Sequence, residues 1–338
     1  MTSNHTVTVF GAYGHTGRFV VAELRSRGWT PILSGRDAGK LSSLGAAHPG
    51  AEVRPASIDS PGSLDRALDG ARAVINCAGP FLDTAVPVIE AALRARIHYL
   101  DVTAEQQAAL TAFERFSGAA REAGVVVLPG MAFYGGLSDL LATAAMGDWA
   151  AADEICIAVA LDGWKPTRGT RATGKRNTAR RFVFSKGKLE FLADPAPTRV
   201  WNFPAPFGTQ DVIGLGLSEI INISRHLPVP EVHAFMNLPP LRDLRDPDTP
   251  PPAPSDESGR SSQVFLVEVV VRRGAEERHA LARGRDIYAV TAPIVVEAAQ
   301  RAVAGLAKKT GVAAAGEAFD ARGFLESLCP THLSLEIQ

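Results

Sequence analysis

The sequence has few cysteines and no apolar run long enough to cross a membrane. Its three cysteines, Cys77, Cys156 and Cys329, lie far apart and form neither a C-x-x-C pair nor a zinc-ligand spacing. Such scarcity favours a reducing compartment in which thiols stay free. No apolar run reaches the roughly 18 residues of a transmembrane helix, and the N-terminus lacks a signal-peptide pattern. We therefore expect a cytoplasmic protein without a membrane partner.

An excess of charge is also missing. The net charge is −1 over 338 residues, so nothing favours a nucleic-acid partner. The eight histidines form no H-E-x-x-H motif and no cluster with acids, and we expect no metal site. With 46% apolar and 21% charged residues, the composition is that of an ordinary globular protein. A chain of this length predicts two domains.

Three glycines near the N-terminus follow a short apolar stretch that predicts a buried strand. Gly11, Gly14 and Gly17 have the spacing G-x-x-G-x-x-G and open a helical pattern. Such a loop turns tightly and approaches a pyrophosphate, to which the helix N-terminus offers N–H donors. The plain alternative is a strand–turn–helix whose glycines serve only packing. The predicted dinucleotide-binding residues of this loop are Gly11, Tyr13, Gly14, His15, Thr16, Gly17 and Arg18.

Arg36 stands about 20 residues past the glycines, where a chain that binds NAD usually has an acid. A guanidinium matches a 2′-phosphate in charge and fork geometry, and Lys40 lies near enough in sequence to help. The sequence therefore predicts NADP(H) as cofactor. Asp37 is the feature that would suit NAD, and a solvated loop is the plain alternative for Arg36 and Lys40. Asp59 follows the third predicted strand, near the expected adenine.

Strands and helices alternate over the first half of the chain. The predicted strands are Val7–Phe10, Pro31–Ser34, Glu52–Arg54, Ala73–Asn76, His98–Asp101 and Val125–Leu128. Right-handed crossovers would give a doubly wound parallel sheet of Rossmann type in the order 3-2-1-4-5-6. Ligands bind beyond the carboxyl ends of such strands. The loop after the fourth strand is therefore expected to line the nicotinamide through Cys77, Ala78, Gly79 and Pro80.

The pattern changes near Asp148. Glu154–Leu161 alternates like a half-exposed strand, and two longer strands at 264–271 and 277–282 predict a hairpin. We expect loops at 202–211, a surface excursion at 239–254, a helix at 292–307 and a tail at 311–338 with one short helix. The α/β fold then comprises an NADP-binding Rossmann domain (1–148, with 290–325 packing back on it). A second α+β domain for substrate and dimerisation (149–289) has a mixed, mostly antiparallel sheet.

A basic stretch lies at 165–188, where nine lysines and arginines occur without an acid. One interpretation is a solvated, partly mobile loop. The other is an anion-binding rim beside the cofactor, which would favour an anionic small-molecule substrate.

The sequence resembles the saccharopine dehydrogenase-like oxidoreductases, whose relatives include trans-acting enoyl reductases. The resemblance is carried by the segments 11–18, 34–37, 76–81, 99–105, 129–130 with 138–139, 168–170, 207–208, 230–232 and 288–297. It implies NADP(H), a Rossmann domain, a mixed-sheet substrate domain and a homodimer. Members of the family tend to have a glycine and an acid where this chain has Ala132 and Tyr134, so substrate handling at that loop differs.

The expected enzyme is an NADPH-dependent reductase that passes hydride to a polarised C=N bond, as in opine chemistry, or to a conjugated C=C bond of a small acidic metabolite. The alternatives are an enoyl reductase acting on a carrier- or CoA-bound acyl chain, and an NADP-binding sensor without catalysis. A short-chain dehydrogenase would need Tyr-x-x-x-Lys, and none of the four tyrosines has a lysine four residues later.

Reduction also needs a proton near the nicotinamide. Tyr134, Asp101 and Thr103 are the predicted catalytic residues, because the loops after the fifth and sixth strands converge there. The phenol of Tyr134 is protonated at neutral pH and able to donate. The plain alternatives are an aromatic wall for Tyr134 and a loop-shaping or helix-capping role for Asp101 and Thr103.

Overall fold

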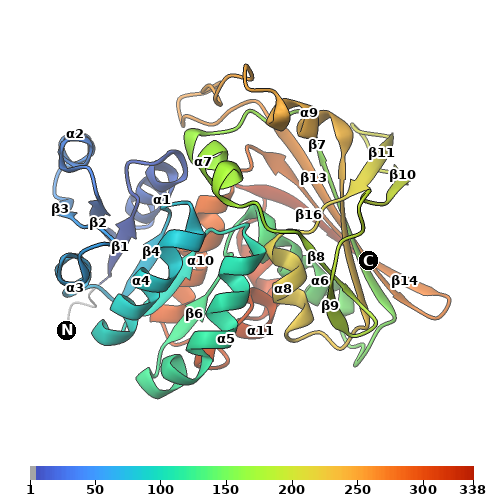
Figure 1. The fold of residues 1–338 in the computed structure, drawn as a ribbon, viewed down its shortest axis with the longest axis horizontal. Helices are drawn as coiled ribbons and strands as arrows, with labels where there is room; N and C mark the ends of the chain where they lie inside the picture. The colour runs from blue at the N-terminus through green and yellow to red at the C-terminus, as the bar shows by residue number, and fades with distance from the viewer. Residues whose placement is uncertain (1–4) are drawn as a thin grey trace.

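A computed structural model describes residues 5–338 and divides them between two β-sheets (Figure 1). The first sheet has seven parallel strands in the order β15-β6-β5-β4-β1-β2-β3. Their bounds are β1 Thr6–Phe10, β2 Thr30–Gly35, β3 Glu52–Pro55, β4 Ala73–Asn76, β5 His98–Asp101, β6 Val126–Leu128 and β15 Gly311–Val312. The Rossmann-type order predicted from the alternation is therefore confirmed. The prediction missed β15, a two-residue strand beside β6, because no apolar run in the sequence indicates a strand there.

Helices cover both faces of this sheet because its strands are apolar on both sides. In β4, Ile75 packs with α1 and α10 on one face, and Val74 packs with α4 and α5 on the other. A parallel sheet with two covered faces needs such continuous apolar strands. The helices of this half are α1 His15–Ser26, α2 Ala38–Ala47, α3 Pro61–Leu68, α4 Phe81–Ala95, α5 Gln106–Ala123 and α10 Thr291–Val303.

The second sheet is mixed and mostly antiparallel, as predicted. Its main path is β10-β11-β12-β7-β13-β14-β16, with the β8–β9 hairpin attached to β12, and only β7 and β12 pair in parallel. The strands are β7 Glu154–Leu161, β8 Phe182–Ser185, β9 Lys188–Phe191, β10 Thr198–Asn202, β11 Thr209–Gly214, β12 Glu231–Asn237, β13 Val264–Arg273, β14 Glu276–Arg285 and β16 Leu333–Ile337. The predicted hairpin is β13–β14.

Four predictions for the second half were wrong. β7 is buried at seven of its eight residues rather than half-exposed, because α6 (Ser138–Met146) and α8 (Ser218–Ser224) pack against the sheet and a Trp201 cluster covers the other face. The expected loop at 202–211 already contains the start of β11, and α9 (Leu238–Arg245) opens the expected surface excursion. The tail holds β15, α11 (Ala315–Ala318), α12 (Ala321–Ser327) and β16 instead of one short helix.

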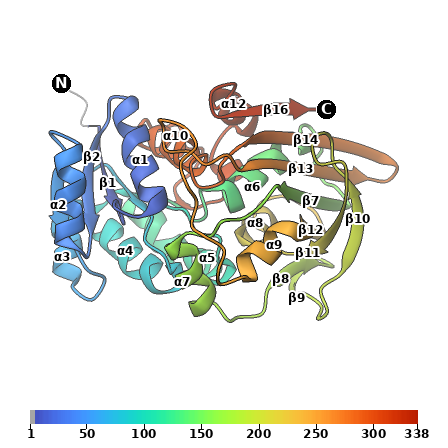
Figure 2. The same ribbon diagram turned by 90° about the horizontal axis from the view of Figure 1, so that it is seen from above.

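The two halves meet along the loops that follow β4, β5 and β6. Helix α7 (Arg168–Arg176) lies between the halves in both views (Figures 1 and 2). Arg176 of α7 forms an ion pair of 2.9 Å with Asp83 in the first turn of α4. A side-chain bond also joins Gln106 at the start of α5 to Phe182 of β8. The second half of the chain thus covers the edge of the first sheet at which its strands have their carboxyl ends.

Candidate active site

The glycine loop is packed too closely to carry side chains. Gly11 has φ +85°, and a Cβ added there would lie 2.8 Å from the Ala78 nitrogen. A Cβ on Gly17 would collide with the carbonyl oxygen of Gly11. Gly14 caps α1 without a side chain, so the N–H groups at the start of this helix are left for another partner. This cradle fits a dinucleotide pyrophosphate.

The end of β2 presents a free cation. Arg36 is exposed and forms no side-chain hydrogen bond or ion pair with the described residues. Asp37, in contrast, accepts a hydrogen bond of 3.0 Å from the Lys40 backbone and an ion pair of 3.0 Å from the Lys40 ammonium. The backbone bond from Lys40 lowers the pKa of Asp37. Because Asp37 caps α2, Arg36 is the group that remains for a ribose phosphate, which favours NADP over NAD.

The rim of the cofactor site contains three further predicted residues. Arg18 is exposed, and its Nε donates to the Tyr13 carbonyl oxygen at 3.2 Å. Thr16 is half-buried in the first turn of α1. Asp59 is exposed after β3, and its carboxylate accepts a bond of 3.1 Å from the Ser57 hydroxyl. All three lie where a cofactor that follows the glycine loop would pass, and their contacts with it stay predictions.

Hydrogen bonds to its flanks fix the loop after β4. The Ala78 nitrogen donates to the Asn76 side chain at 3.0 Å, and the Thr84 hydroxyl donates to the Ala78 carbonyl oxygen at 2.6 Å. Burial raises the pKa of the Cys77 thiol, so this thiol stays protonated and acts as a small packing group. Glu105 accepts the first N–H groups of α4, with the Phe81 nitrogen at 2.6 Å. The Gly79–Pro80 segment is thus held rigidly.

Asp101 and Thr103 hold loops together. Both side chains are buried. One carboxylate oxygen of Asp101 accepts from the Gly130 and Thr103 nitrogens at 2.8 and 3.0 Å, and the other accepts from the Tyr99 hydroxyl at 2.8 Å. The Thr103 hydroxyl accepts from the Glu105 nitrogen at 3.0 Å. Burial raises the pKa of Asp101 to about 6. These contacts account for both residues as loop supports, and their catalytic assignment stays a prediction.

Tyr134 differs because its hydroxyl has no partner. It lies in the segment η1 (Phe133–Leu137) after β6, is 8% exposed, and its buried oxygen has no hydrogen bond with the described residues. Burial raises the pKa of Tyr134 well above its usual value, so the phenol keeps its proton. Trp164 stacks on its ring at 5.5 Å between centroids. A buried unpartnered hydroxyl costs stability and indicates a place for a ligand atom or water.

An aromatic row connects Tyr134 with the glycine loop. Trp164 Nε1 donates to the Tyr288 hydroxyl at 2.9 Å, and the Tyr288 ring lies 5.3 Å from the His15 ring. His15 directly follows Gly14. Burial lowers the pKa of His15, so its ring is neutral at pH 7. A row of packed aromatic rings therefore links the glycine loop to Tyr134.

The basic stretch forms a helix in part. Its segment α7 has no buried residue, and Thr167 caps it through a bond of 3.0 Å to the Thr170 nitrogen. A Cβ added at Gly79 would lie 3.0 Å from the Thr173 hydroxyl, so α7 covers the loop after β4. Arg171 donates to the Thr249 carbonyl oxygen at 2.8 Å. The cations of α7 thus lie close to the loop after β4, and both interpretations of their role stay predictions.

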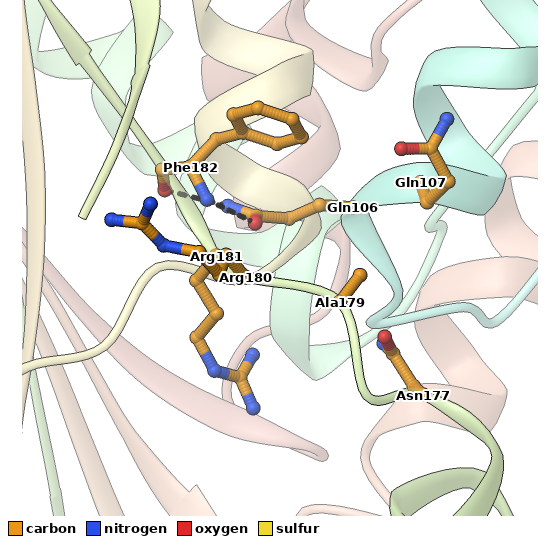
Figure 3. Close-up of a pocket in the computed structure, with 7 residues that line it drawn as sticks. All are labelled: Gln106, Gln107, Asn177, Ala179, Arg180, Arg181 and Phe182. Atoms are coloured by element: carbon orange, nitrogen blue, oxygen red, sulfur yellow. Dashed lines mark hydrogen bonds between the residues drawn. The ribbon is translucent and has the colours of Figure 1, made fainter.

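Two further charged residues act on Tyr134: Glu219, which the sequence analysis did not select, and Arg181, which belongs to the basic stretch at 165–188. Glu219 of α8 is 3% exposed, and only one of its carboxylate oxygens has a partner, the Leu217 nitrogen at 2.7 Å. Arg181 donates to the Gly216 carbonyl oxygen at 3.3 Å. Figure 3 shows Arg181 beside the Gln106 amide, which clamps the Phe182 backbone. A usable signal existed, since Glu219 is the single charge in the apolar stretch 214–223.

Among residues 5–338, no three histidine, cysteine or acidic side chains gather into a group that could hold a metal ion. Over the same residues, no helix has both the length and the apolar character needed to cross a membrane.

Comparisons with known proteins agree with this geometry. The family model of the saccharopine dehydrogenase NADP binding domain matches residues 7–128. A saccharopine dehydrogenase-like oxidoreductase of Bos taurus is 29% identical over 145 residues, which cover 38% of this chain and 34% of that protein. An Arabidopsis thaliana protein described as a "probable mitochondrial saccharopine dehydrogenase-like oxidoreductase" is 26% identical over 144 residues, 38% of this chain and 32% of that protein. The matches thus span about a third of the length of these curated relatives.

For the second half of the chain, the similarity is one of fold and not of sequence. Apo saccharopine dehydrogenase (L-Glu forming) from Saccharomyces cerevisiae matches 98% of this chain and 99% of its own, with a TM-score of 0.67 and 11% identity. Both sheets therefore have the arrangement found in that structure. Residues 7–128 thus match the saccharopine dehydrogenase NADP-binding domain, and the cofactor of this domain is NADP(H).

Proposed function

We propose that the chain is an NADPH-dependent reductase that transfers hydride to a polarised C=N bond or a conjugated C=C bond of a small acidic metabolite. The observation that carries this proposal is the Tyr134 hydroxyl, which is buried, protonated and unpartnered at the end of the aromatic row from the cofactor cradle. A protein that only sensed NADP(H) would have no use for such a group beyond the cofactor.

The residues of the chain would divide the work as follows. The bound cofactor supplies hydride. Arg36 and the glycine loop hold its phosphates, and the loop at 77–80 orients the nicotinamide end. Tyr134 donates a hydrogen bond to the heteroatom of the acceptor, and this polarises the bond to be reduced. Trp164 and the roofing helix α7 exclude water from the reacting atoms.

Positive charge supports an acidic acceptor. The stretch at 165–188 contributes nine cations and no acid, and α7 within it lies over the loop after β4. A cationic entrance attracts anions over a Debye length. An enoyl reductase acting on a CoA- or carrier-bound acyl chain is the second candidate, because the same cations suit the phosphates of such a carrier arm.

The organisation proposed for the chain follows from this assignment. Residues 1–148, with 290–325 packed on them, would hold the cofactor, and residues 149–289 would bind the acceptor and form a homodimer. A cytoplasmic location is part of the same proposal. α6, within the first range, also packs against β13 and β14, so the two units share an interface.

The test is NADPH oxidation with a panel of acceptors. The panel contains imines formed from amino acids and 2-oxo acids, free conjugated enoic acids, and enoyl-CoA thioesters. We expect steady loss of NADPH absorbance with an acidic imine or enoic acid, and deuterium transfer from 4-deuterated NADPH to the product. Turnover with thioesters alone would favour the enoyl reductase. Tight NADPH binding without turnover across the panel would favour the sensor.

A further inference from the structure

A second unpartnered oxygen lies against the segment that carries Tyr134. One carboxylate oxygen of Glu219 has no hydrogen bond with the described residues, although Glu219 is only 3% exposed. The adjacent Ser218 hydroxyl donates to the Thr103 carbonyl oxygen at 2.9 Å and contacts the Tyr134 carbonyl oxygen at 3.5 Å. The start of α8 therefore packs directly on the loops after β5 and β6.

Glycine makes this close approach possible. Gly135 has φ +95°, and a Cβ added there would lie 2.6 Å from the Ser218 hydroxyl. The backbone N–H of Gly135 also faces the Glu219 carboxylate and lowers its pKa slightly against the larger effect of burial. The two groups interact electrostatically, since the pKa of Tyr134 is raised by burial first, then by Tyr288 and by Glu219. Two unpartnered oxygens thus share one buried region beside the cofactor site.

We propose that Glu219 supplies the proton consumed in the reduction, while the Tyr134 hydroxyl orients the atom that receives it. This inference rests on the reductase function proposed above. It assigns the chemistry to a residue of the second half that neither the glycine motif nor the family match includes.

The acidity of the two groups separates their roles. A phenol whose pKa lies well above its usual value holds its proton too strongly to give it up at neutral pH. Burial raises the pKa of Glu219 to about 7, and the hydrogen bond from the Leu217 nitrogen and the Arg181 charge limit the rise. Asp101 has a raised pKa too, but both of its oxygens already have protein partners. Glu219 combines a near-neutral pKa with a free oxygen.

Few other charges face Glu219. Arg181 reaches it from the segment before β8, and Tyr134 from η1. From α6, Asp139 binds His226 at 2.7 Å just beyond the end of α8, where burial lowers and Asp139 raises the pKa of this histidine. The remaining described contacts of the Glu219 carboxylate are backbone N–H groups. Arg181 is therefore the charge that tunes the proton affinity of Glu219.

The step balances without a further reagent. Hydride from the reduced nicotinamide, which would be left oxidised, adds to the electrophilic carbon of the C=N bond or to the β-carbon of the conjugated C=C bond. The π electron pair moves to the nitrogen or to the carbonyl oxygen, and in the second case the enol formed on protonation tautomerises to the saturated carbonyl compound. The O–H bond of Glu219 breaks, a bond from that proton to the heteroatom forms, and Glu219 is left as a carboxylate. Solvent then restores the proton. Beside Arg181, whose charge acts on Glu219, a hollow of about 30 Å³ that Gln106 and Phe182 also line has room for a water.

The first test compares Glu219→Gln with Glu190→Gln, a half-exposed acid of the β8–β9 hairpin. In the wild type and in the Glu190 variant, kcat should fall as pH rises through about 7. In Glu219→Gln, kcat should be about 100-fold lower and flat with pH, while NADPH affinity stays within about twofold. A Glu219→Gln enzyme with wild-type kcat and pH profile overturns the proposal and leaves the reductase function standing.

Two further measurements do not depend on the folding or turnover of that variant. Infrared titration of the cofactor-free wild type should show a buried carboxylic acid band that is lost near pH 7, and its absence overturns the proposal. Arg181→Gln should move the falling limb of the kcat profile to higher pH, because a charge that favours the carboxylate is removed; an unmoved limb overturns it. Failure of the reductase function itself would instead appear as a wild-type protein that does not oxidise NADPH, whichever acceptor is added.

Discussion

The cofactor side of the site comes from one short stretch of chain, whereas the acceptor side is assembled from distant segments. The glycine loop and Arg36 lie within 26 residues of one another, and the loop works through backbone N–H groups and missing side chains. The residues proposed for the acceptor side, Tyr134, Arg181 and Glu219, come from three separate segments of the chain and would act through side chains. A local motif can therefore reveal the first side, and only the fold reveals the second.

The largest expected effect lies on the cofactor side. Gly17→Ala places a methyl group against the Gly11 carbonyl oxygen, so the loop must move away from the phosphates. We expect the affinity for both NADPH and NADH to fall by more than about 100-fold. Gly118→Ala is the control, since nothing lies within 4 Å of its added Cβ. Fluorescence titration of both variants checks this, and unchanged binding by Gly17→Ala would refute the cradle.

On the acceptor side, Glu219 should destabilise the protein at neutral pH. Its pKa is about 7 in the folded protein against an ordinary glutamate value of 4.5, so the unfolded chain releases this proton at lower pH. Stability should therefore decline as pH rises from about 4.5 to about 7, by about 3 kcal/mol, and level off above. In Glu219→Gln the free energy of unfolding should no longer show the part of this pH-dependent decline that is due to Glu219. Urea unfolding at pH 5 and pH 8 measures it, and parallel pH trends in the two proteins would speak against a raised pKa.

Arg36 should decide between the two cofactors. Arg36→Asp removes a charge-assisted contact and adds repulsion, so NADPH affinity should fall by about 2 kcal/mol, or roughly 30-fold, while NADH binding changes little. Arg322→Asp replaces another exposed arginine, in α12, and serves as the control. A wild type that binds both cofactors equally would remove the basis of this assignment.

The smallest expected effect concerns the basic stretch. If its cations steer an acidic acceptor, raising the salt concentration from about 0.02 to 0.5 M should increase KM about threefold while kcat stays constant. Steady-state kinetics at several salt concentrations measures this. A KM that ignores salt would favour the solvated-segment interpretation.

These differences explain how far the sequence could lead. The alternation of strands and helices predicted the order of six strands because local apolar patterns determine each of them. β15 is two residues long, and β7 is buried only because distant elements cover it, so neither followed from local pattern. The role of Asp37 could not be inferred from the sequence either. Only the structure shows that Asp37 caps α2, which leaves Arg36 as the group without a partner among the described residues.

The acceptor side shows the same limit more sharply. Tyr134 was selected from its glycine-rich loop, yet only the fold shows that its hydroxyl is unpartnered. Glu219 lies 85 residues further along the chain, and it comes near this loop only because its neighbour Ser218, at the start of α8, packs on the Tyr134 backbone. Spacing in the sequence could not connect these residues.

The measurement that tests the division of the site most directly is made on Tyr134→Phe beside Arg36→Asp, with the NADPH dissociation constant and kcat recorded for each. Tyr134→Phe keeps the ring and deletes the hydroxyl, so kcat should fall about 100-fold while the dissociation constant stays within about twofold. Arg36→Asp should weaken NADPH binding and regain kcat at saturating cofactor. A Tyr134→Phe enzyme with wild-type kcat would contradict the account, because the hydroxyl would then be part of an aromatic wall.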